Sequence, residues 1–241
     1  SFTQVTVSSS TSTRNRLAAF SLTDWSLSDF NPNSNGTVLA LSSGGGALYA
    51  GGLFTTIGGL SRSLIAKLNL TTGVATAAFN AGAVGTSVRA LLYDKEGSGP
   101  LYVGGDFTNI GGGAHTYYEV IDPTTGLNLP GGFNADGLVY ALALDSNTVP
   151  ASRVLWVGGA FTTFNAVAHV GIARITDPGN TAAAAVAATD PSLSASATVS
   201  CFAASPEDDV YFGGSFTLLQ NATDRTPAIS LGAITAGGTS L

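Results

Sequence analysis

The chain has a single cysteine, Cys201, among its 241 residues, so an internal disulfide is excluded. Methionine is absent, and only nine residues are Lys or Arg against fifteen Asp or Glu, which gives a formal net charge of −6. Because no basic stripe exists, we expect no nucleic-acid-binding surface. No apolar run approaches the roughly 18 residues that span a bilayer, so we also expect no membrane span.

The N-terminus, Ser1-Phe2-Thr3, has no basic region followed by an apolar one. We therefore expect that this form of the chain carries no signal peptide, either because one was removed or because the chain is a piece of something longer. Cysteine content does not fix the redox compartment. The low Lys content and heavy Ser and Thr usage favour a secreted or cell-surface protein.

Apolar residues and glycine are what the chain has in quantity. Hydrophobic residues make up 44% and charged residues 10% of the sequence, which is enough for a packed core and argues against disorder. The 31 glycines are spread along the whole chain. This distribution predicts many tight turns between short strands.

An internal repeat organises the sequence. The motif Gly-Gly-x-Phe-Thr occurs at residues 51–55, 104–108, 158–162 and 213–217, and residues 1–3 form the tail of a fifth copy. The motif phenylalanines are 52 to 55 residues apart, at Phe2, Phe54, Phe107, Phe161 and Phe216. This spacing defines a unit of roughly 53 residues, and a fixed period of this length indicates a repeat architecture.

Other positions follow the same period. An aromatic residue lies two positions before each glycine pair, at Tyr49, Tyr102, Trp156 and Tyr211. A Val-x-small-apolar element precedes it, at residues 38–41, 88–91, 139–142 and 199–202. Short apolar runs follow each Phe-Thr, at residues 17–20, 64–68, 118–121, 172–175 and 228–231. A Phe-Asn pair closes three of the units, at residues 30–31, 79–80 and 133–134.

Each unit is therefore predicted to contain three clear short strands and a weaker fourth near the Phe-Asn pair, with turns between them. No segment has a sustained helical period. We expect the Ala-rich stretch at 181–188 to be an insertion loop. Four short antiparallel strands per unit predict an all-β fold of about four units, a β-propeller or a propeller-like array. Units stack because one sheet cannot bury both its faces, so we expect the repeated aromatic residues between neighbouring blades.

The glycine pair ends a strand in every copy. It marks a point where the backbone either turns with a positive φ or approaches another backbone closely.

These motifs resemble the delta-60 β-propeller repeats of large bacterial surface and secreted proteins, and similar units occur in fungal cell-polarity cortical marker proteins. The resemblance covers nearly the whole chain and is weakest at 176–198, where the Phe-Asn pair is missing. It implies a propeller fold and an extracellular or surface location. It brings no catalytic residues, because the family has no agreed active site.

The strand order is unequal at the two ends. Four Val-x-Ala-Leu strands, four strands that end at Gly-Gly and five Ile-Ala-x-Leu strands are predicted. We therefore expect residues 1–241 to form one domain that is either an excerpt of a longer propeller or is completed by a neighbouring subunit. Completion by a neighbour would allow polymerisation by strand exchange.

The two histidines and the cysteine occupy repeat positions. His115 and His169 lie eight residues after the repeat Phe, and Arg62 and Arg225 fill nearly the same slot, eight and nine residues after theirs, with Arg14 as the counterpart in the N-terminal copy. A slot filled by Arg or His in each unit indicates a scaffold role, such as capping carbonyls, over a metal site or a catalytic role. Cys201 occupies an Ala slot that calls for a small buried residue, which favours an unreactive side chain over a nucleophile.

The remaining candidates are the acidic cluster and the sequons. Residues 207–209 (Glu-Asp-Asp) are expected to form a solvated turn, with weak calcium binding as the alternative. Asn35, Asn69 and Asn221 begin N-glycosylation sequons in predicted loops. Such sequons also arise by chance in a chain rich in Ser and Thr, and they matter only in a eukaryotic secreted protein.

Two functions remain open. The first is an extracellular structural or adhesive module, a segment or subunit of a surface assembly or filament, with self-association or other surface proteins and glycans as partners. The second is a carbohydrate-binding or carbohydrate-active propeller with its site on the loop face. Regular repeats favour the first, and we therefore expect no enzyme activity, no cofactor and no metal.

Overall fold

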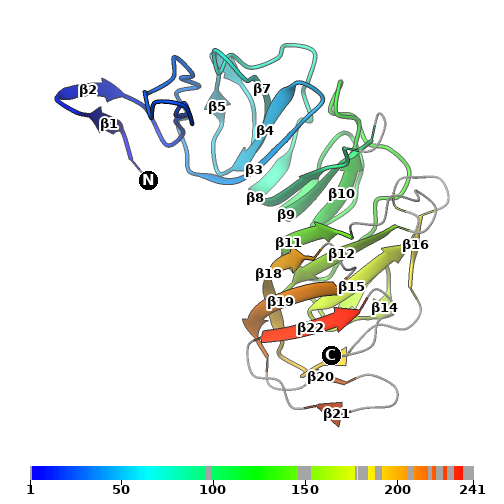
Figure 1. Ribbon diagram of the computed structural model, residues 1–241. Coiled ribbons are helices and arrows are strands. Elements are labelled where there is room, and N and C mark those ends of the chain that lie inside the picture. The colour runs from blue at the N-terminus through cyan, green and yellow to red at the C-terminus, as the bar shows by residue number, and fades with distance from the viewer. Residues whose placement is uncertain are drawn as a thin grey trace.

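The computed structural model describes residues 2–95, 99–145, 153–176, 178, 184–187, 192–205, 209–216, 219–220, 225–226 and 231–235. Throughout these ranges the regular elements are β-strands in small antiparallel sheets, which confirms the all-β prediction. The sheets follow one another along an open, curved array, and the described residues form no closed propeller (Figure 1). The same ranges contain no helix long and apolar enough to cross a membrane.

Four principal sheets correspond to the four complete copies of the repeat. We call these sheets units 1 to 4 and give the strands of each in hydrogen-bonded order. Unit 1 consists of β3 (Val38–Gly44), β4 (Ala47–Gly52) and β7 (Ile65–Asn69), and unit 2 of β8 (Val84–Tyr93), β9 (Leu101–Asn109) and β10 (Tyr118–Ile121). Unit 3 consists of β11 (Val139–Leu144), β12 (Val154–Gly159), β15 (Ile172–Thr176) and β16 (Ala185–Val186), and unit 4 of β18 (Thr198–Ala204), β19 (Asp209–Ser215) and β22 (Leu231–Thr235). The three clear strands predicted for each unit are thus confirmed.

The weak fourth strand takes two forms. In units 1 and 2 it is one isolated bridge, Leu68 to Ala75 and Ile121 to Asn128. In unit 3 it is β16, which pairs with β15. The prediction that 181–188 is only an insertion loop was wrong, because β16 lies inside this stretch and supplies the fourth strand that the missing Phe-Asn pair seemed to remove.

Two predicted Ile-Ala-x-Leu strands differ from expectation. The first run, at 17–20, forms no strand and has only a bridge from Phe20 to Leu27. In unit 4 the strand is β22, which begins at Leu231 and not at residue 228. The strand starts eleven residues after the repeat Phe in units 1 to 3 but fifteen after Phe216, so the longer connection displaces it.

The connections after Phe-Thr were predicted as loops, and several are small hairpins. These are β1 (Gln4–Val7) with β2 (Ser10–Thr13), β5 (Thr56–Ile57) with β6 (Leu60–Ser61), β13 (Thr163–Phe164) with β14 (Val167–Ala168), and β20 (Leu219–Gln220) with β21 (Arg225–Thr226) and β17 (Ser192–Leu193). The β5–β6 turn places Gly58 and Gly59 at φ of 61° and 81°. A two-residue turn with both φ values positive matches the strand twist, so the glycines determine this hairpin.

The glycine pair of each motif does not form a turn, since neither glycine of any copy has a positive φ. The pair instead allows neighbouring strands to approach the backbone closely. A Cβ on Gly52, Gly105, Gly159 or Gly214 would overlap a carbonyl oxygen at the bulged start of the neighbouring strand in the same unit. A Cβ on Gly51, Gly104 or Gly158 would overlap a valine of the next unit, Val88, Val139 or Val199. Both glycines therefore permit contacts that any side chain would block.

The hydrophobic core lies between units, as the sequence predicts. Tyr49 of unit 1 packs in one cluster with Phe107 of unit 2. Tyr102 and Phe161 share the next cluster, and Trp156 and Phe216 the one after it. In each interface, one unit supplies the aromatic residue before Gly-Gly and the following unit supplies the motif phenylalanine.

Candidate functional site

One buried acidic residue departs from the repeat pattern. Glu119 lies in β10 at the position that Ala66 and Ala173 occupy in units 1 and 3. All three residues are fully buried. An ionisable group at a slot that otherwise takes a buried methyl group is the clearest chemical irregularity of the scaffold, and burying a charge is costly unless it is paired.

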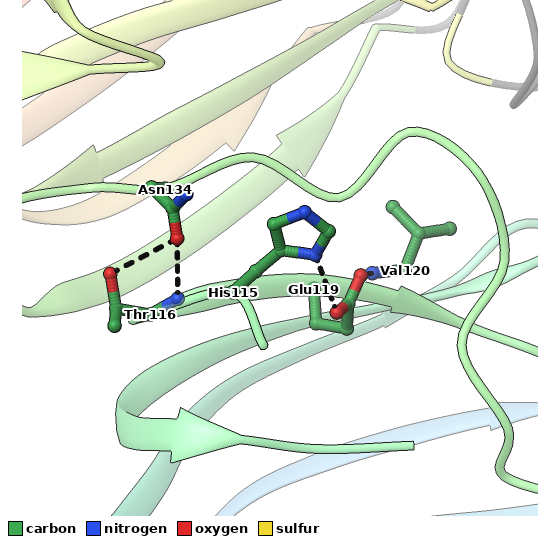
Figure 2. Close-up of polar contacts among 5 residues, drawn as sticks. All are labelled: His115, Thr116, Glu119, Val120 and Asn134. Carbon is green, nitrogen blue, oxygen red and sulfur yellow. Dashed lines mark hydrogen bonds and ion pairs between the residues drawn. The ribbon is translucent and has the colours of Figure 1, made fainter. Parts of the chain in front are cut away.

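The Glu119 carboxylate has two hydrogen-bond partners, which Figure 2 shows. His115 Nδ1 lies 2.8 Å from Oε2, and the backbone N–H of Val120 donates to Oε1 at 2.9 Å. The His115 side chain is 34% exposed while that of Glu119 is 0% exposed. The pair therefore links a buried carboxyl group to a partly exposed imidazole.

Two glycines make room for the carboxylate. A Cβ on Gly113 would overlap Oε2 of Glu119, and a Cβ on Gly132 would overlap Oε1. The loops that carry these glycines are held together by Thr116, whose N–H and hydroxyl donate to Oδ1 of Asn134 at 2.9 and 3.4 Å (Figure 2). The Thr116 hydroxyl also donates to the Ala135 carbonyl at 2.9 Å.

Burial sets the protonation chemistry of this pair. Desolvation raises the pKa of Glu119 above its ordinary value of 4.5, although the hydrogen bonds from His115 and Val120 oppose the rise. A carboxyl with a raised pKa next to an imidazole can exchange protons, which is a property shared by catalytic pairs and by structural pairs. Of the described residues, no three His, Cys, Asp or Glu gather as a metal site.

The Arg or His slot caps carbonyls in two units, as predicted. Arg14 donates to the carbonyls of Thr13 and Ser28 at 2.9 and 2.8 Å. Arg62 donates to three carbonyls, those of residues 61, 76 and 77.

The histidines fill the slot differently. His115 contacts a carboxylate, so the carbonyl-capping prediction was wrong for it. His169 is 5% exposed, and its backbone N–H donates to Thr162, as that of Arg62 does to Thr55. Arg225 lies in β21, and its side chain is outside the described set.

Cys201 was predicted to be buried, and this was wrong. Its counterparts Ala90 and Ala141 are 7% and 9% exposed, whereas Cys201 is exposed. Its thiol lies 3.7 Å from the Gly213 carbonyl oxygen.

Two of the three sequon asparagines lie in exposed turns. Asn35 uses its whole amide, because Oδ1 accepts from the N–H groups of Thr55 and Thr56 and Nδ2 donates to Thr55 Oγ1 at 2.8 Å. Asn69 accepts at Oδ1 from the N–H groups of Thr71 and Thr72. Asn221 lies outside the described residues, as do Glu207 and Asp208 of the acidic cluster, while Asp209 begins β19. Glycosylation and calcium binding stay predictions.

Sequence reasoning missed the Glu119–His115 pair, although the signal was present. Aligning the apolar runs places Glu119 against two alanines, which marks unit 2 as the one that departs from pattern. No protein-family model matches the chain, and no curated protein matches it either.

Proposed function

We propose that this chain is an extracellular structural or adhesive scaffold, a segment or subunit of a surface assembly, whose units are blades of a β-propeller. The proposal assigns the chain no catalytic task. It rests on the role of the repeated residues, because the first motif glycines and the buried motif aromatics of units 1 to 3 pack against the next unit. Repeat proteins of this kind gain stability from neighbour contacts and present extended surfaces.

One observation carries the proposal. The aromatic slot before Gly-Gly is 1%, 0% and 0% exposed in units 1 to 3, at Tyr49, Tyr102 and Trp156, but Tyr211 in unit 4 is 40% exposed. In the N-terminal segment, Phe2 is 41% exposed, whereas Phe54 and Phe107 are fully buried. Unit 4 thus exposes the aromatic residue that precedes Gly-Gly, which is one half of the interface between units. The N-terminal segment exposes the motif phenylalanine, which is the other half.

These two faces are complementary halves of an interface that the chain already makes three times. A surface of this kind binds another unit with the matching face, and repeated head-to-tail contacts of this type produce rings or filaments. The ring-closing and filament-forming outcomes both suit a surface assembly, and an extracellular location is part of the proposal.

Sedimentation velocity on the purified chain and on Tyr211→Arg tests the role. We expect association that rises with concentration in the unsubstituted chain and is lost in the variant, since a buried unpaired arginine is costly. Leu127→Arg is the control, because Leu127 is 56% exposed and belongs to a turn of unit 2. A strictly monomeric chain, or equal association in Tyr211→Arg, would overturn the proposal.

A further inference from the structure

The first strands of the four units lie next to one another and line a groove. β3 packs against β8, β8 against β11, and β11 against β18. Three residues from each strand line this open depression, which has a volume of about 330 Å³: residues 39–41, 89–91, 140–142 and 200–202. We call this the inner groove. Its volume lies in the range of small-molecule sites, about 300–1,000 Å³.

The lining of the groove includes the one position of each first strand that varies between units. The Val-x-Ala-Leu strands have Val at the first position in every unit. Their third position always holds a small apolar residue and their fourth position a large apolar residue. The x position differs in chemistry in each unit, being Leu39, Arg89, Tyr140 and Ser200. Scaffold packing accounts for the constant positions, and the variable ones all face the same groove.

Arg89 is the one charged residue among the twelve that line the inner groove. Its guanidinium carbon lies 5.5 Å from the centroid of the Tyr140 ring. Stacking on an aromatic face leaves the in-plane N–H groups of a guanidinium available for a carboxylate. Arg89 Nε is itself buried without a hydrogen-bond acceptor among the described residues, so a ligand in the groove must use the terminal N–H groups of the guanidinium.

Most of the other side chains in the wall are apolar. Leu39 and Leu41 are 41% and 49% exposed, and Leu91, Leu142 and Phe202 line the same space. Besides the Arg89 guanidinium, the polar side-chain groups of the wall are the hydroxyls of Tyr140 and Ser200 and the thiol of Cys201. These few polar groups, set among apolar side chains, favour an anion with an apolar body over an acidic glycan.

We propose that the inner groove binds a small amphiphilic carboxylate, with its carboxylate on Arg89 and its apolar body against the leucines and Phe202. The site goes beyond the scaffold role and does not depend on it. The chain as a whole is acidic, with a net charge of −6, so anion binding must come from this local cation and not from the general field of the protein.

NMR titration of the purified chain with hexanoate tests the site, using hexanamide, acetate and glucuronate for comparison. We expect hexanoate to bind at least about tenfold more tightly than each of the other three, because a charge-assisted hydrogen bond and apolar burial both contribute. Amide shifts on β8 and β11 should report the binding. Equal affinity for hexanamide, or tighter binding of glucuronate, would overturn the proposal.

Two variants and a matched control sharpen the test. Arg89→Gln should reduce hexanoate affinity about tenfold and remove the preference over hexanamide, while Arg89→Lys should keep the preference. Arg174→Gln is the control, since Arg174 also stacks at 5.5 Å over an aromatic ring, that of Trp156, but does not line the groove. Unchanged binding in a folded Arg89→Gln, or equal loss in Arg174→Gln, contradicts the assignment. Circular dichroism of each variant reports folding, and Arg89→Lys decides the case if Arg89→Gln does not fold.

Discussion

At the scale of single residues, the second glycine of the motif is the most restricted position in the unit. A Cβ on Gly105 would overlap the Ser87 carbonyl oxygen at the bulge between β8 and β9. We expect Gly105→Ala to lower the free energy of unfolding by about 3 kcal/mol or more, because backbone and not a flexible side chain blocks the methyl group. Chemical denaturation measures the change.

Gly112→Ala is the matched control for this substitution. Gly112 has a φ of 84° and open space where a Cβ would lie. Left-handed strain alone should cost about 1–2 kcal/mol there. A loss at Gly105 no larger than at Gly112 would show that the close approach in the motif does not limit the fold.

Glu119 gives a prediction about pH. Its pKa is raised in the folded chain, so above the ordinary value of 4.5 the folded state holds more protons on this group than the unfolded state does. Its contribution to stability is therefore greatest at low pH and falls as pH rises through the folded pKa. Glu119→Gln does not titrate, so the difference in unfolding free energy between variant and unsubstituted chain should shift in favour of the variant from pH 4.5 upward. Parallel pH profiles would show that burial does not perturb this carboxyl.

At the scale of elements, the β5–β6 and β13–β14 hairpins have two-residue turns. Unit 1 uses Gly58-Gly59, while unit 3 uses Asn165 and Ala166 at φ of 52° and 60°. An alanine in the left-handed region is strained, and Asn-Gly is the preferred sequence for this turn. We expect Ala166→Gly to raise the free energy of unfolding by about 0.5–1 kcal/mol.

Thermal unfolding compares this variant with a neighbouring one. Ala168→Gly, at an exposed position in β14, should lower stability by about 0.5–1 kcal/mol, because glycine in a strand loses more conformational entropy. If both substitutions lowered the stability, the left-handed conformation of Ala166 would not be a source of strain in the turn.

The same elements show how far sequence reasoning reaches. The Val-x-Ala-Leu and Gly-Gly strands could be predicted because their pattern recurs at a fixed period and each has a partner in the same unit. The small hairpins could not, since strands of two residues such as Thr56–Ile57 are too short to show an alternating pattern. β16 was missed because alanines carry no strand signal, and its position is set by pairing with β15.

The candidate sites could not be predicted from the sequence for a different reason. The inner groove joins residues about 50 positions apart, and only the stacking of β3, β8, β11 and β18 brings Arg89 over Tyr140. Glu119 was visible in the aligned repeats, but its pairing with His115 depends on a loop whose path the sequence does not determine. The exposure of Cys201 depends on how its surroundings pack, which a repeat pattern alone does not reveal.

At the scale of the whole molecule, the array is a series of interfaces between neighbouring units. Each interface combines a glycine–valine contact with an aromatic pair, and a buried ion pair between Asp94 and Arg153 also joins units 2 and 3. Stability in such an array is approximately a sum of unit and interface contributions, so the curved chain of Figure 1 is suited to extension by further units of the same kind.

Electron microscopy of the purified chain over a range of concentrations tests most directly whether these units act as a self-associating scaffold. We predict closed rings or filaments in which the unit spacing within one chain continues without a break into the next. Single crescent-shaped particles at every concentration would contradict a self-associating scaffold.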